Sequence, residues 1–118
     1  MNNILTLVIA IYFNCICYIM NTKQQHNNLV DLNIIGDKIE RLPKRILNNI
    51  SEYGYSDVKN KKYYVIYDNK KINFGDIRYQ DYLIHKDLKR KKNYRTRHIN
   101  DDYNNPYKPS FYSWFILW

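Results

Sequence analysis

The segment Lys61–Gly75, KKYYVIYDNKKINFG, decides the fold that the sequence predicts. Residues 62–68 are rich in tyrosine and valine, which have a high propensity for β-strands. Asn69-Lys70 suits a two-residue turn, because asparagine tolerates the positive φ that such turns need. Residues 71–74 would then return as a second strand. We therefore predict a β-hairpin with one face resting on helices.

An amphipathic helix is expected before the hairpin. Between Asp37 and Tyr53, apolar residues recur at three- and four-residue steps, namely at Ile39, Leu42, Ile46, Leu47 and Ile50. Proline is tolerated only in the first turn of a helix, so Pro43 predicts that the regular helix begins near Leu42. Gly54 is a natural stop. The preceding apolar run, Leu29–Ile35, fits a strand or a helix equally well.

A second helix is predicted after the hairpin, over Tyr79–His98, YQDYLIHKDLKRKKNYRTRH. Its acidic residues, Asp81 and Asp87, come early and its basic residues come late, which complements the helix dipole. Residues 86–97 hold seven basic side chains against one aspartate, out of a net charge of +8 for the whole chain. Such a concentration attracts polyanions, which include nucleic acid, an anionic membrane and an acidic protein surface.

The helical spacing also predicts side-chain pairs within this helix. Residues three and four apart lie on one face, so Asp81 should hold His85, and Asp87 should pair with Arg90 or Lys91. The apolar pattern ends at Leu88. The second half of the helix is therefore expected to face solvent or a partner.

The C-terminal segment Ser110–Trp118 is apolar and aromatic, and Pro109-Ser110 is expected to open a short helix there. Its large rings follow i, i+3, i+4, i+7 spacing and should be buried together; they are Phe111, Trp114, Phe115 and Trp118. A segment this hydrophobic either folds back on the core or docks on another molecule.

The N-terminal residues 1–20 form an apolar leader. Residues 4–20 are apolar apart from Thr6 and Asn14, and about 17 residues is the lower limit for crossing a bilayer. The leader therefore fits a membrane anchor, a secretory signal or neither. Residues 21–28 read as a polar linker, and residues 29–118 as one small α+β domain behind the leader.

The residue types argue against an enzyme. The chain has three glycines and no phosphate-cradling loop, and its two cysteines, Cys15 and Cys17, both lie in the leader. A straight helix cannot bring His85 and His98 to one metal ion. The catalytic alternative is a nuclease-like site, with His85 or His98 as general base and Asp81 or Asp87 placing a cation, but a histidine near an aspartate is common by chance. We therefore predict no catalytic residues, no metal site and no cofactor.

Binding to a polyanion, most of all nucleic acid, is the first function that the sequence predicts. The residues expected to contact phosphates are Lys89, Arg90, Lys91, Lys92, Arg95 and Arg97, with Tyr94 stacking or bracing. The alternative is a structural protein–protein interaction module. Its polar network would be internal and of low exposure, built from Asp81, His85, Asp87, Arg90, Tyr94, Arg97 and His98, with Trp114 and Trp118 docking on a partner.

The order of residues over about 63–118 resembles a family of short uncharacterised proteins of nucleocytoplasmic large DNA viruses, of the mimivirus and chlorovirus type. The positions that carry the resemblance are Phe74-Gly75, Asp81-Tyr82, His85-Lys86-Asp87, Arg90-Lys91, Tyr94, Arg97-His98, Ser113-Trp114 and Leu117-Trp118. The chain departs from the family pattern at Arg78, where glycine is usual, and at Tyr103, where tryptophan is favoured.

The resemblance implies a viral gene product, such as a virion component, and brings no activity or cofactor. It implies a place in the virion or the host cytoplasm, with viral structural proteins as partners. Residues 4–20 add a membrane as a further expected partner.

Overall fold

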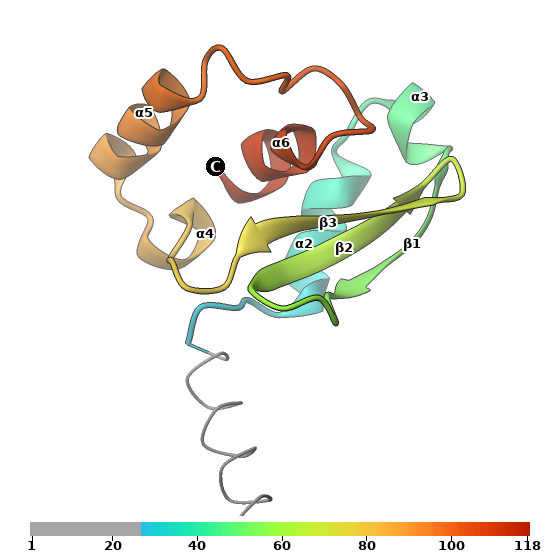
Figure 1. Cartoon of the computed structure of the whole chain (residues 1–118), viewed down its shortest axis with the longest axis horizontal. Helices are drawn as coiled ribbons and strands as arrows, with labels where there is room; N and C mark the ends of the chain where they lie inside the picture. The colour runs from blue at the N-terminus through green and yellow to red at the C-terminus, as the bar shows by residue number, and fades with distance from the viewer. Residues whose placement is uncertain (1–26) are drawn as a thin grey trace, which may run out of the picture.

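Three strands pair in one antiparallel sheet of order β1-β2-β3, and the central strand β2 is rich in tyrosine, valine and isoleucine, which favour extended backbone. The computed structural model describes residues 27–118 (Figure 1). Its elements in chain order are α2 (Leu32–Glu40), α3 (Lys44–Leu47), β1 (Ile50–Tyr55), β2 (Lys61–Tyr67), β3 (Lys70–Asp76), α4 (Tyr82–His85), α5 (Leu88–Arg97), α6 (Pro109–Tyr112) and the π-helix η1 (Ser113–Leu117). The predicted α+β class is confirmed. The leader, residues 1–20, and linker residues 21–26 lie outside the described part.

The hairpin of β2 and β3 is confirmed, but its turn lies one residue earlier than predicted. Tyr67 pairs with Lys70, so the two turn residues are Asp68 and Asn69, with φ of 49° and 62°. Both positions of such a turn need positive φ, which aspartate and asparagine adopt more easily than lysine does. The prediction of Asn69-Lys70 was therefore wrong by one position.

The amphipathic helix predicted from Leu42 toward Tyr53 is wrong. Only the four residues of α3 are helical there, and Ile50–Tyr55 forms the edge strand β1. Its residues pair with β2 from Ile50 opposite Tyr67 to Tyr55 opposite Tyr63. The hydrogen bonds that residues 50–55 form with β2 stabilise the strand more than the helical spacing of a few apolar residues favours a helix.

Gly54 lies inside β1 and does not stop a helix. A Cβ atom there would come within 2.9 Å of the Tyr64 ring, which lies across the glycine from the neighbouring strand. The ambiguous Leu29–Ile35 run is resolved as the start of α2, whose first turn is capped by the side chain of Asp31.

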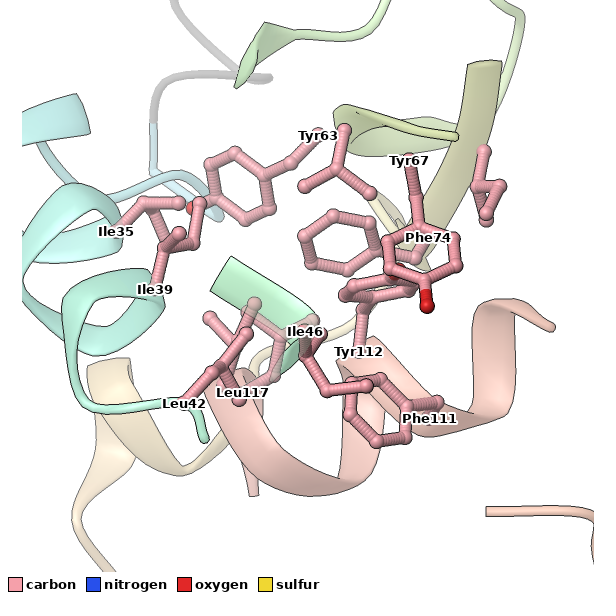
Figure 2. Close-up of a cluster of buried hydrophobic side chains, with 13 residues drawn as sticks. Ile35, Ile39, Leu42, Ile46, Tyr63, Tyr67, Phe74, Phe111, Tyr112 and Leu117 are labelled. Carbon is pink, nitrogen blue, oxygen red and sulfur yellow. The ribbon is translucent and has the colours of Figure 1, made fainter. Parts of the chain in front are cut away.

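The core lies on one face of the sheet, under α2 and the C-terminal helices (Figure 2). Strand residues 63, 65 and 67 point into it, as do Ile72 and Phe74 of β3. The helices contribute Ile35, Ile39, Leu42, Ile46, Phe111, Tyr112, Ile116 and Leu117. The C-terminal segment is therefore folded back on the core of its own chain.

The C-terminal rings are not all buried together, and that prediction needs correction. Phe111 and Trp114 are buried, but Phe115 is 43% exposed, and Trp118 is half-buried. Residues 113–117 form a π-helix, in which the Trp118 amide donates to the Ser113 carbonyl. The wider turn rotates the following residues, so Ile116 and Leu117 take the inward positions that a 3.6-residue period gives to Phe115 and Trp118.

The single helix predicted over Tyr79–His98 is two helices. The helix is interrupted at Lys86, which has φ of 52°, and α5 runs in a different direction from α4 (Figure 1). Asp81 caps α4 by accepting from the Leu83 amide, and Asp87 caps α5 by accepting from the Lys89 and Arg90 amides. Each acid thus starts its own helix, because a side-chain oxygen before a helix satisfies amides that have no partner within it.

The membrane expectation also needs correction. Among the helices of residues 27–118, none is long and apolar enough to cross a bilayer. The apolar segment 4–20, on which that expectation rested, lies outside the described residues.

Candidate nucleic-acid interface

Helix α5 is attached to the molecule by aromatic contacts. None of its residues is fully buried. The Tyr94 ring stacks on the Trp118 ring, with centroids 4.2 Å apart and planes 3° apart. The Lys91 ammonium lies 4.5 Å from the centre of the Tyr82 ring, and the Arg95 guanidinium lies 4.6 Å from the Trp114 ring. These contacts hold the helix without neutralising its charge.

The remaining cations of α5 face solvent. Lys89, Arg90, Lys92 and Arg97 are exposed, whereas Lys91 and Arg95 are half-buried against the rings. In the described part of the chain, none of the six cations forms a salt bridge with an acid of the protein. The predicted phosphate contacts therefore divide into four free side chains and two that anchor the helix. Tyr94 braces the helix, since Trp118 and His98 cover its ring.

The predicted pairs of Asp81 with His85 and of Asp87 with Arg90 or Lys91 are not the ones that form. Asp87 is used as the α5 cap, and Asp81 binds the ammonium of Lys62, 2.8 Å away. These partners form because each aspartate is the N-cap of a helix, so its side chain turns to the amides of the first turn, and Asp81 also reaches the buried Lys62 ammonium.

The Lys62–Asp81 pair is almost completely buried, with side-chain exposures of 1% and 4%. Burial raises the pKa of Asp81, and the nearby Lys62 ammonium and the Leu83 amide oppose that rise. Sequence reasoning missed Lys62. The one signal was a lysine inside an apolar strand, which is weak, because alternate strand residues normally face solvent.

The two histidines have separate surroundings. His98 pairs with Asp101 of the following turn. His85 accepts a hydrogen bond at Nδ1 from the Asp87 amide, and its Nε2 is shielded with no partner among the described residues. Its ring also lies against the Trp118 ring, 5.3 Å between centroids. The residues of 27–118 contain no group of three or more side chains gathered to hold a metal ion.

A cavity of about 560 Å³ lies beside α5, and most of the positions that carried the family resemblance line it. Those residues are Gly75, Asp81, Arg90, Tyr94, Arg97, His98, Ser113, Leu117 and Trp118. His85 and Trp114 also carried the resemblance but do not line the cavity. The His85 ring contacts Trp118, and the Trp114 ring stacks on Tyr103. Sequence reasoning did not identify Lys61, Tyr79, Gln80 or Asn93, which also line the cavity.

A family model described as "Family of unknown function (DUF5754)" matches residues 55–98. The match covers β2, β3, α4 and α5, and thus overlaps the resemblance over residues 63–98. It supports a likeness to an uncharacterised family and carries no information on viral origin. No curated protein and no solved structure matches the chain.

Acid is expected to destabilise the protein through His85. Burial, followed by the nearby Arg90 guanidinium, lowers the pKa of His85 from its ordinary value of 6.5, and Asp87 and Asp81 oppose this. The unfolded chain therefore binds the proton more readily. Stability should fall as the pH drops below about 6.5 and level off below the lowered pKa. Thermal melts from pH 7.5 to 4.5 measure the fall.

The matched control is His85→Asn, which places an amide oxygen near the position of Nδ1 but does not titrate. The two proteins differ only at position 85, so the comparison isolates the contribution of His85. The melting temperature of the variant should depend less on pH than that of the native protein. Parallel curves for the two proteins would contradict the assignment to His85.

Proposed function

We propose that the protein is a non-enzymatic nucleic-acid-binding protein that contacts phosphates through the exposed cations of α5. The supporting observation is that these cations lie on an ordered helix with no ion-pair partner among the described residues. Lys89, Arg90, Lys92 and Arg97 are the direct contacts. Lys91 and Arg95 add to the field and keep the helix in place.

Nucleic acid is the polyanion that fits best, because its phosphates are regularly spaced and its bases offer flat faces to the tyrosines nearby. The resemblance to proteins of large DNA viruses extends the proposal. On that basis the protein acts in the virion or in the host cytoplasm, with viral structural proteins as its neighbours.

The alternative, a protein–protein module with an internal polar network, has less support. It expects low exposure for Asp87, Arg90 and His98, but Asp87 and Arg90 are exposed and His98 is half-exposed. It also expects Trp114 and Trp118 to be available for docking. Trp114 is 7% exposed and stacks on Tyr103, so it is not available for docking, and of the two tryptophans only the half-buried Trp118 remains.

Binding to nucleic acid is expected to weaken steeply with salt. Each phosphate that a cation engages adds about 0.7 to 0.9 to the slope of log affinity against log salt. Four contacts therefore predict a loss of roughly 50- to 150-fold between 50 and 200 mM salt. Fluorescence anisotropy of a labelled 20-nucleotide single strand and its duplex, titrated with the full chain, measures this. Absent binding at 50 mM salt, or binding indifferent to salt, would refute the proposal.

A further inference from the structure

The cavity beside α5 is built from three parts of the chain that are distant in sequence. The start of β2 and the end of β3 form one side, α5 forms another, and η1 with Trp118 forms a third. Arg90, Tyr94 and Arg97 of α5 line it at helical spacing, so one face of the basic helix turns toward it. The volume, about 560 Å³, lies within the range of small-ligand sites.

The charges around the cavity favour an anion. Its two acids are already engaged, Asp76 by Arg78 at 2.7 Å and Asp81 by Lys62 at 2.8 Å. Its other cations, Lys61, Arg90 and Arg97, have no salt bridge with another described residue. A guanidinium presents planar paired donors that match phosphate oxygens, and here two guanidiniums line one cavity.

The other lining groups suit a base. Tyr79 lies at the cavity and is 65% exposed, and Trp118 is half-buried, with Tyr94 stacked on one ring face and the His85 ring centre 5.3 Å from its own. Aromatic rings at such a site stack on nucleobases of any sequence. Gln80 and Asn93 add exposed amides, which can both donate to and accept from the edge of a base. The cavity thus combines phosphate-binding cations, a stacking surface and hydrogen-bonding groups.

We infer that this cavity takes one nucleotide of a single strand, with its phosphate at Arg90 and Arg97 and its base at Tyr79 and Trp118. The inference rests on the proposed function and specifies its substrate. In a duplex the bases are stacked and paired, and extracting one costs free energy that a single strand does not pay. The protein should therefore prefer single strands to duplexes, although both present phosphates to the outer face of α5.

The test compares two double variants that remove the same charge. Arg90→Ala with Arg97→Ala removes cations that line the cavity, whereas Lys89→Ala with Lys92→Ala removes cations of α5 that do not. The probes are labelled dT20 and a 20-base-pair duplex at one salt concentration. The arginine variant should lose more affinity for dT20 than the lysine variant does, and the two should lose similar affinity for the duplex. Equal losses for dT20 would overturn the inference.

Tyr79→Ala tests the base contact without changing charge. Its side chain is exposed, so the variant should melt at the temperature of the native protein, which circular dichroism checks. Affinity for dT20 should fall about tenfold, and affinity for the duplex should not change. The inference would be wrong if Tyr79→Ala bound dT20 as tightly as the native protein and the native protein bound single strand and duplex equally. The proposed function would not be affected by that result.

Two further results distinguish a failure of this inference from a failure of the proposed function. If neither probe binds the native protein, the proposed function fails and the inference fails with it. Free thymidine monophosphate should compete poorly with dT20, because it lacks the neighbouring phosphates that α5 engages. Displacement of dT20 by an equimolar amount of the free nucleotide would show a mononucleotide site and would overturn the assignment to a strand.

Discussion

Replacing Asp81 with alanine is expected to lower the free energy of unfolding by about 3–5 kcal/mol, because it leaves a buried ammonium without its counter-ion. The Lys62 side chain is 1% exposed, and among the described residues its ammonium bonds only to the Asp81 carboxylate. The change also removes the cap of α4 at the Leu83 amide. Small domains are stable by about 5–15 kcal/mol, so the variant should be close to unfolding at room temperature.

Two controls isolate the buried charge as the cause. Lys62→Met with Asp81→Asn removes both charges and keeps a capping oxygen, so it should recover most of the lost stability. Asp57→Ala breaks the salt bridge to Lys71, in which the Asp57 side chain is 80% exposed and the Lys71 side chain 42%, and should leave the free energy of unfolding unchanged. Urea unfolding followed by circular dichroism measures all three. An Asp81→Ala protein as stable as the native one would contradict the argument.

Removing the four exposed cations of α5 together should reduce nucleic-acid affinity by roughly a hundredfold or more at 50 mM salt. The variant carries alanine at Lys89, Arg90, Lys92 and Arg97. Alanine favours helix, and none of the four side chains is buried, so α5 should remain folded. The loss should also appear as a shallower salt dependence, because fewer phosphates are engaged.

The matched control for that variant removes four cations elsewhere on the surface, at Lys44, Arg45, Lys59 and Lys70, which are exposed and lie outside α5. It has the same net charge, so it reports the effect of overall charge alone. Its affinity should fall much less than that of the α5 variant. Equal losses in the two variants would show that binding follows net charge and not the helix.

Strand propensity and charge are the two properties that could be predicted from a segment's own residues. The hairpin follows from the β propensity of residues 62–68 and the nearby turn residues, and the basic charge of 86–97 is plain from composition. The turn was misplaced by one position, because Asp68 and Asn69 both tolerate positive φ and only strand pairing selects between neighbouring registers.

The tertiary structure alone decided what each segment lies against. The helical spacing of apolar residues from Ile39 to Ile50 predicted a helix toward Tyr53, yet residues 50–55 form β1 because β2 offers them a hydrogen-bonded edge. Lys62 and Asp81, 19 residues apart, form a buried pair, and the π-helix turns Ile116 and Leu117 inward in place of Phe115. The candidate cavity needs β2, β3, α5 and η1 at once.

The physical reason is the range over which each property acts. Backbone dihedral preference and side-chain charge belong to single residues and their near neighbours, so the sequence by itself determined the hairpin and the basic segment. Strand pairing, burial and the partner of an ionised group depend on residues brought together by folding. Those contacts placed Arg90 and Arg97 with Tyr79 and Trp118 around one cavity, an arrangement that no local pattern contains.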